Sequence, residues 1–198
     1  MSGLVGSKLN IRGSGLVGSL GTDGQHLLSA GAGVTNVFET VSGGGITVAD
    51  AWRLTTDFAG DANPIASNLE RVDQTIEGNI GSAMTESSGI FTFPSTGIYL
   101  VTYQGSNSYN GDSRYVLYDI LGTVDNSTYI SMNNNANTIT QTGGSSYTTA
   151  FLQSFVDVTN VTNVKVAFKI AVEDDSTATQ GSSSSTITGF SFIRLGDT

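Results

Sequence analysis

A strand–turn–strand segment in the middle of the chain constrains the fold more than any other stretch. It reads SGIFTFPSTGIYLVTY over residues 88–103. Phe91 and Phe93 fall on one face of a short strand, residues 94–97 predict a turn, and residues 98–103 predict a second strand that is apolar on both faces. Such a strand needs a cover on each face. In a small all-β domain, we expect one cover to be the opposing sheet and the other to be a second copy of the chain.

Composition favours β-structure and argues against several partners. The 198 residues suffice for one domain with or without an appendage, and glycine (25) is frequent while charged residues (13%) are few. Cysteine is absent, which excludes disulfides and thiolate metal sites. The formal net charge of −9 disfavours nucleic acid and anionic membrane surfaces. Without a long apolar run or a charged-then-apolar leader, we expect a soluble protein with no membrane insertion, not secreted by the general signal route.

Short strands separated by turn residues predict a β-sandwich from Ala51 onward. One predicted strand, residues 164–172, alternates large apolar residues with Lys and Ala, which is typical of an outer sheet with one wet face. Three others are apolar at both parities and belong to an inner sheet covered on both sides: Ile98–Tyr103, Ala150–Val156 and Gly189–Leu195. The full set of expected strands is 51–56, 69–72, 89–93, 97–106, 114–123, 129–133, 147–158, 164–172 and 186–195.

The motif aromatic-Thr-aromatic-Pro followed by Gly-Ile-Tyr-Leu-Val-Thr-Tyr, at residues 91–103, resembles two strands of a known superfamily. That superfamily contains tumour necrosis factor and the complement globular heads, and residues 186–193 (TITGFSFI) resemble its last strand. The resemblance covers roughly Ala51 to Leu195. It implies an all-β, ten-strand jelly-roll β-sandwich that assembles as a homotrimer, with the inner sheet facing the trimer axis.

Side-chain size predicts which face of the inner sheet points to that axis. The large aromatics Tyr99, Tyr103, Phe190 and Phe192 bury the most area and are expected between the sheets. The residues of opposite parity then form the predicted trimer interface: Ile98, Leu100, Thr102, Ile187, Gly189, Ser191 and Ile193. The alternative is a monomer that tolerates scattered exposed apolar residues.

Residues 1–48 differ from the predicted head, residues 49–198. Glycine recurs every few positions and the string GLVGS occurs at residues 3–7 and 15–19, but the apolar residues are too many for a plain flexible linker. Residues 21–33 (GTDGQHLLSAGAG) are similar to a segment of bacteriophage fibre proteins that lies in or beside an intertwined trimeric stem. We therefore expect residues 1–48 to be a Gly-rich stem or anchor that contacts another virion protein.

No motif for catalysis or cofactor binding emerges from the sequence. His26 is the only histidine and lies in the Gly-rich segment, so neither a Ser-His-Asp arrangement nor a multi-histidine metal site is expected. The carboxylates at 57 and 61 and at 173–175 are typical of solvated turns, and none shows calcium-loop spacing. We expect no enzymatic activity and no cofactor.

These patterns predict a trimeric surface spike of a bacteriophage virion, either a capsid decoration or head fibre or a short tail fibre, with a role in host attachment. The alternative is a cellular carbohydrate-binding adhesin module. Candidate contact turns are 133–137, 143–146 and 174–185. Candidate contacts to a neutral host-surface glycan or a host protein lie together in one turn, unless Tyr109 only packs against a neighbouring loop: Asn107, Tyr109, Asn110 and Asp112.

Overall fold

A computed structural model describes residues 22, 25–28, 37–39 and 45–198, and divides the chain into two compact units, residues 1–45 and 46–198. In the first unit, β1 (His26–Leu28) pairs antiparallel with β2 (Val37–Glu39), and Leu27 lies opposite Phe38. His26 therefore lies in a short strand. The two GLVGS strings and most of the predicted stem lie outside the described residues.

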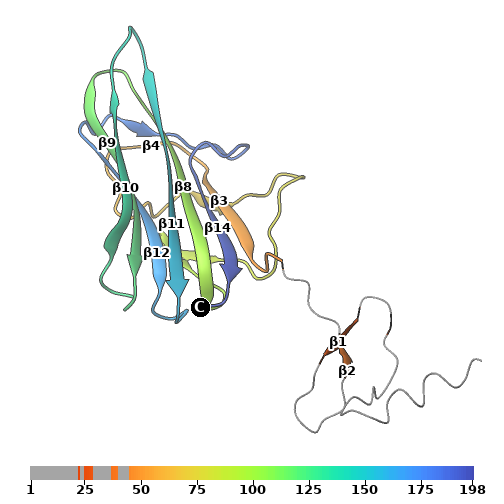
Figure 1. Cartoon of the computed structure of the whole chain (residues 1–198). Coiled ribbons are helices and arrows are strands. Elements are labelled where there is room, and N and C mark those ends of the chain that lie inside the picture. The colour runs from red at the N-terminus through yellow and green to blue at the C-terminus, as the bar shows by residue number, and fades with distance from the viewer. Residues whose placement is uncertain (1–21, 23–24, 29–36, 40–44) are drawn as a thin grey trace, which may run out of the picture. The chain divides into compact units, whose positions relative to one another are not determined.

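The second unit is a sandwich of two sheets (Figure 1), in which the strands of each sheet pair antiparallel. The five-stranded outer sheet has the order β10 (Ile130–Ile139), β9 (Ser113–Thr123), β12 (Lys165–Val172), β7 (Ile90–Thr92) and β6 (Thr85–Ser87). The inner sheet has seven strands. Six of them follow the order β4 (Phe58–Ala59), β13 (Ala178–Thr179), β8 (Gly97–Tyr109), β14 (Gly189–Gly196), β3 (Ala49–Leu54) and β5 (Leu69–Arg71). β13 and β14 pair with one edge of β8, and the seventh strand, β11 (Ser146–Val158), pairs with its opposite edge.

The predicted all-β jelly roll is confirmed, and every predicted strand range overlaps an observed strand. The structure adds β4, β6 and β13, which are too short to show a periodicity. It also extends β10 to Ile139, so the prediction of a turn at residues 133–137 is wrong. Among the described residues, no helix is long and apolar enough to cross a membrane.

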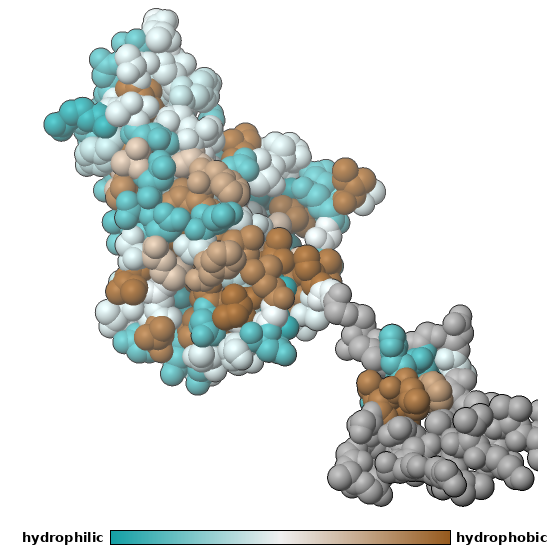
Figure 2. Space-filling model, viewed as in Figure 1, coloured by the Kyte–Doolittle hydropathy of each residue, from teal (hydrophilic) through white to brown (hydrophobic). Residues whose placement is uncertain are grey.

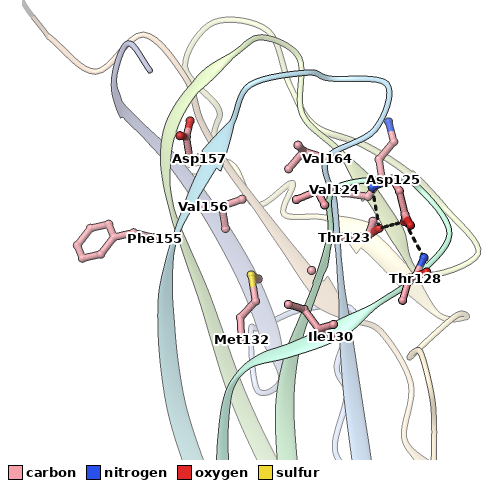
Figure 3. Close-up of a pocket in the computed structure, with 12 residues that line it drawn as sticks. Thr123, Val124, Asp125, Thr128, Ile130, Met132, Phe155, Val156, Asp157 and Val164 are labelled. Carbon is pink, nitrogen blue, oxygen red and sulfur yellow. Dashed lines mark hydrogen bonds between the residues drawn. The ribbon is translucent and has the colours of Figure 1, made fainter.

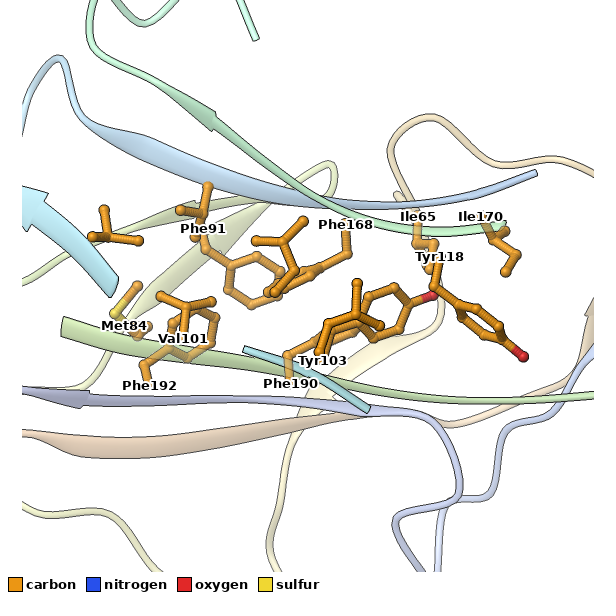
Figure 4. Packing of buried hydrophobic residues seen from close by; sticks show 14 of the residues in the cluster. Ile65, Met84, Phe91, Val101, Tyr103, Tyr118, Phe168, Ile170, Phe190 and Phe192 are labelled. Atoms are coloured by element: carbon orange, nitrogen blue, oxygen red, sulfur yellow. The ribbon is translucent and has the colours of Figure 1, made fainter. Parts of the chain in front are cut away.

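Aromatic side chains from both sheets fill the space between them (Figure 4). Phe91 and Phe168 from the outer sheet meet Phe190 and Phe192 from the inner sheet, and Phe168 stacks on Phe190 with ring centroids 4.0 Å apart. Each such pair contributes about 0.5–1.5 kcal/mol beyond the area it buries. The predicted inward orientation of the large aromatics is confirmed, because all four side chains are buried: Tyr99, Tyr103, Phe190 and Phe192.

The face of β12 that carries Lys165, Ala167 and Lys169 is less exposed to solvent than the alternating sequence predicts. Lys165 is 8% exposed and Ala167 is 1% exposed, whereas Lys169 is half-buried. Ala167 lies between Leu121 and Ile90 in neighbouring strands. The Lys165 ammonium donates a hydrogen bond to the Val161 carbonyl at 2.6 Å, and burial lowers its pKa. Side chains of adjacent strands therefore cover this end of the outer sheet.

Candidate functional site

The face of the inner sheet that points away from the core carries the candidate site. Its side chains come from alternate positions of β8, β11, β14 and β3. Figure 2 shows hydrophobic residues gathered over the ends of β8, β14 and β3 that lie near the end of the chain. The residues predicted to form the trimer interface are half-buried here, except Gly189, which is buried: Ile98, Leu100, Thr102, Ile187, Gly189, Ser191 and Ile193.

An apolar row runs straight across this face. Strand pairing places Phe155 of β11 opposite Leu100 of β8, Leu100 opposite Ile193 of β14, and Ile193 opposite Ala49 of β3, which bridges to Ile80. Directly opposed residues share a face of the sheet. Phe155 is 69% exposed and Ile80 is 49% exposed at the two ends of the row. The predicted Leu100 and Ile193 are thus the centre of a continuous apolar surface that we call the apolar row.

A polar row lies next to the apolar row. Thr102 and Ser191 face each other across β8 and β14, and their hydroxyls are hydrogen-bonded at 2.5 Å. Gln153 of β11 and Ala51 of β3 continue the row on either side. The two hydroxyls bond to each other within the chain, so burying them under a second copy leaves neither without a hydrogen bond.

Beyond the polar row, the face is hollowed. The hollow has a volume of about 430 Å³ and is lined by Gln104, Ser106, Thr149, Ala150, Phe151 and Ile187. Ile187 lies just outside β14, and its carbonyl accepts a hydrogen bond from Gln104 Nε2 at 3.2 Å. Gly189 has no room for a side chain, because an added Cβ would lie 2.8 Å from the Trp52 carbonyl oxygen. Gly189 therefore permits close strand packing and offers no contact of its own.

Arg53 closes this face at the β3 side. Its guanidinium is fully buried and binds Glu70 at 2.6 Å, Asp73, and Glu77 at 3.5 Å. The hydrogen bond that Arg53 donates to Glu70 raises the pKa of the arginine most. The surrounding carboxylates are neutralised in part by this arginine, and no cluster of three or more metal-ligating side chains occurs in the part of the chain that the structure describes.

The predicted ligand turn is largely occupied by its own contacts. Asn107 is 0% exposed and its amide donates to Thr179 Oγ1 at 2.9 Å, so it lacks the exposure that a surface ligand contact requires. The Tyr109 hydroxyl donates to Asp174 Oδ2 at 2.7 Å. That bond raises the pKa of Tyr109 and lowers the pKa of Asp174. The alternative interpretation, in which Tyr109 packs against a neighbouring loop, agrees with this geometry.

Asn110 and Asp112 are exposed and are held by Gln141. The Gln141 side-chain amide donates to Asn110 Oδ1 at 2.8 Å, and its backbone N–H donates to Asp112 Oδ1 at 2.8 Å. The structure therefore brings Asn110 and Asp112 together at the surface, beside the loop that leads into β11.

Comparison with known proteins identifies the fold. No protein-family model and no curated protein matches the chain. Among solved structures, the chain is similar to Eiger TNF from S. frugiperda, with 15% identity over 78% of this chain and 96% of that chain and a TM-score of 0.58. It is also similar to murine APRIL at pH 5.0, with 11% identity over 75% of this chain and 98% of that chain and a TM-score of 0.53. The chain has a tumour-necrosis-factor-like jelly-roll fold. The resemblance predicted from residues 88–103 and 186–193 is confirmed at the level of the fold.

Sequence reasoning missed the aromatic edge of this jelly roll. Tyr147, Phe151 and Phe155 alternate along β11 and are 65%, 64% and 69% exposed. Their spacing of four, which keeps them on one face of a strand, was visible in the sequence. The missing information was register, since only strand pairing aligns Phe155 with Leu100 and Ile193.

Proposed function

We propose that the chain forms the trimeric head of a surface spike on a bacteriophage virion, and that the outward face of its inner sheet is the subunit interface. The apolar row supports the trimer most directly. Fully burying a Phe, Leu or Ile side chain is worth about 1.5–3 kcal/mol, and a three-fold ring repeats each contact in every subunit. The superfamily that the sequence resembles also assembles as trimers.

The two ends of the row differ, and this difference favours a ring. Phe155 lies on the edge strand β11, while Ala49 and Ile80 lie at the opposite side of the sheet. A contact between the β11 edge of one copy and the β14–β3 side of the next uses two different surfaces. Such head-to-tail contacts close into rings when the rotation allows it.

The proposed location on a virion is inferred from the sequence of the first unit. Residues 21–33 are similar to a segment of bacteriophage fibre proteins, and the chain divides near that segment into two units. In this proposal, the first unit joins another virion protein and the head displays loops for attachment to a host-surface glycan or protein. A capsid decoration, a head fibre and a short tail fibre all fit. The burial of Asn107 and the bond between Tyr109 and Asp174 argue against a glycan contact at that turn for a spike and for an adhesin alike.

Two measurements test the proposal. Native mass spectrometry of the full chain at micromolar concentration is expected to show the mass of three chains, and a monomer would contradict the interface. Gold-labelled antibody against the head, imaged by electron microscopy on purified particles, is expected to decorate the virion surface. If the chain is a trimer but the antibody decorates bacterial cells instead of virus particles, the adhesin alternative would be favoured.

A further inference from the structure

A second hollow lies at one end of the sandwich, between the two sheets (Figure 3). Its volume is about 480 Å³. We call it the end pocket, and it is lined by Gly122, Thr123, Val124, Asp125, Thr128, Ile130, Met132, Phe155, Val156, Asp157, Val164 and Lys165. Val124, Ile130, Met132, Val156 and Val164 converge on the hollow, whereas the Phe155 ring points away from it.

The apolar walls come from both sheets. Ile130 and Met132 belong to β10, Val164 precedes β12, and Val156 comes from β11 of the inner sheet. Gly122 makes room for one wall, because an added Cβ would lie 2.5 Å from Met132 Sδ. Water in such a space finds few hydrogen-bond partners, while an unfilled apolar void forfeits packing. The end pocket is therefore better suited to an apolar molecule than to water.

The rim of the end pocket is acidic. Asp125 Oδ1 accepts hydrogen bonds from Thr123 Oγ1 at 2.8 Å, Ser127 N at 2.9 Å and Thr128 N at 2.7 Å. These bonds hold the pKa of Asp125 well below its usual range, so the carboxylate stays ionised at neutral pH. Asp157 is exposed on β11, but it alternates with Val156 and pairs with Ile98, so its side chain lies on the outward face of the inner sheet.

Lys165 does not offset the Asp125 carboxylate at the mouth of the pocket. Strand alternation places its side chain on the opposite face of the outer sheet from Val164, and its ammonium donates to the Val161 carbonyl. The chain as a whole adds a negative field, with a formal net charge of −9.

We infer that the end pocket binds a small apolar molecule that is uncharged or carries a single positive charge, with its carbon skeleton between the sheets and its head beside Asp125. The apolar walls select the skeleton and the rim selects against anions. The end pocket adjoins the apolar row at Phe155, but its ligand lies between the sheets, and the inference does not depend on the virion assignment.

Three probes of equal chain length test the inference: octylammonium, 1-octanol and octanoate. Each is titrated into the full chain, with the Met132 methyl resonance followed by NMR. Octylammonium and octanol are expected to shift this resonance saturably. Octanoate is expected to bind roughly 2–5-fold more weakly than octanol for each carboxylate that it faces. No saturable shift with any probe, or octanoate binding as tightly as octylammonium, would overturn the inference.

Variants then locate the ligand. Ile130→Trp and Val124→Trp place a large ring in the pocket from side chains that are 64% and 79% exposed, so at least one of them should fold, and a folded variant should bind octanol at least tenfold more weakly. Asp125→Asn keeps an Oδ1 acceptor and removes the charge, so it should reduce the preference for octylammonium over octanoate, while the matched Asp175→Asn, at an exposed acid outside the pocket, should not. Unchanged octanol affinity in a folded tryptophan variant, shown by its thermal melt, would place the ligand elsewhere and refute the site. The Met132 resonance reports ligand binding and native mass spectrometry reports trimer assembly, so the ligand site and the trimer can each be refuted independently of the other.

Discussion

At the residue scale, one buried carboxylate joins two strands of the inner sheet to the segment that leads into β6. Asp50 is 4% exposed and accepts hydrogen bonds from Arg71 Nε at 2.9 Å, Trp52 Nε1 at 3.1 Å and Met84 N at 2.8 Å. Arg71 also lies over the Trp52 ring, 4.7 Å from its centroid. The charge of Asp50 is therefore paired and its oxygens are satisfied, which is the condition under which a buried carboxylate is tolerated.

Replacing Asp50 leaves the Met84 N–H without its partner, whereas Arg71 is 36% exposed and still donates to the Met84 carbonyl. An unsatisfied buried donor costs about 1–3 kcal/mol, so Asp50→Ala is expected to lower the free energy of unfolding by that amount. Urea denaturation followed by tryptophan fluorescence measures it. The exposed Asp175→Ala is the matched control and should change stability by less than about 0.5 kcal/mol. Equal effects in the two variants would show that the Asp50 network contributes little.

The bond between Tyr109 and Asp174 gives a pH-dependent contribution to stability. It lowers the folded-state pKa of Asp174, so its stabilisation is present above the unfolded pKa of about 4 and is lost as pH falls through the folded value. Tyr109→Phe is expected to lower the melting temperature at pH 7, with the difference from the parent shrinking below about pH 4. Thermal melts from pH 7 to pH 2 measure this. Tyr147→Phe, at a 65% exposed position, serves as the control, and a pH-independent difference for Tyr109→Phe would contradict the assignment.

At the element scale, asparagines of β10 protect the edge of β11. Asn133 Nδ2 donates to the Gln153 carbonyl and Asn137 Nδ2 donates to the Thr149 carbonyl, both at 2.8 Å. β10 and β11 belong to different sheets, so these side chains join the sheets where no backbone ladder does. Unpaired edge carbonyls are a route to aggregation, and the amides satisfy two of them.

Removing both amides should therefore weaken the closure of the sandwich. The double variant Asn133→Ala/Asn137→Ala is expected to lose about 1–3 kcal/mol, since each net hydrogen bond contributes about 0.5–1.5 kcal/mol. Chemical denaturation measures the loss, and light scattering at raised temperature reports earlier aggregation. Asn135→Ala, at an exposed neighbouring position, is the control. A double variant as stable as this control would show that the amides do not hold β11.

Long strands with a clear period were predictable from the sequence, because burial on one or both faces dictates their pattern. β8, β11, β12 and β14 were predicted close to their observed limits. β10 was predicted too short because its asparagines suggest a turn when read locally, whereas their partners are carbonyls of a strand that follows later in the chain. The burial of Asn107 was invisible for the same reason, since its partner Thr179 lies on the remote two-residue strand β13. Local patterns predicted the strands, and long-range register decided the site.

At the scale of the whole molecule, a charged substitution is expected to disrupt trimer assembly in the apolar row but not on the outer sheet. Leu100→Asp or Ile193→Asp places an unpaired charge in the centre of the proposed interface, which costs several kcal/mol when it is buried. We expect either variant to shift the native mass from three chains to one. Lys169→Asp on the outer sheet is the control and should keep the mass of three chains. Circular dichroism checks that each variant remains folded, and a trimer that survives both interface substitutions would place the subunit contact elsewhere.

The division of the chain into two units sets where the head can be separated from the first unit. The sequence predicted a boundary after residue 48, but Val48 is 5% exposed within the core cluster, and its carbonyl accepts the Arg194 N–H at 2.9 Å. The second unit begins at Ile46, so a truncation that starts there keeps this contact. Removing residues 1–45 is therefore expected to leave a folded trimeric head, and removing residues 1–48 is expected to lower its melting temperature. If the first unit is the attachment, the head lacking residues 1–45 should trimerise in native mass spectrometry yet be absent from purified particles when it replaces the full chain. Incorporation at the level of the full chain would show that the head itself carries the attachment.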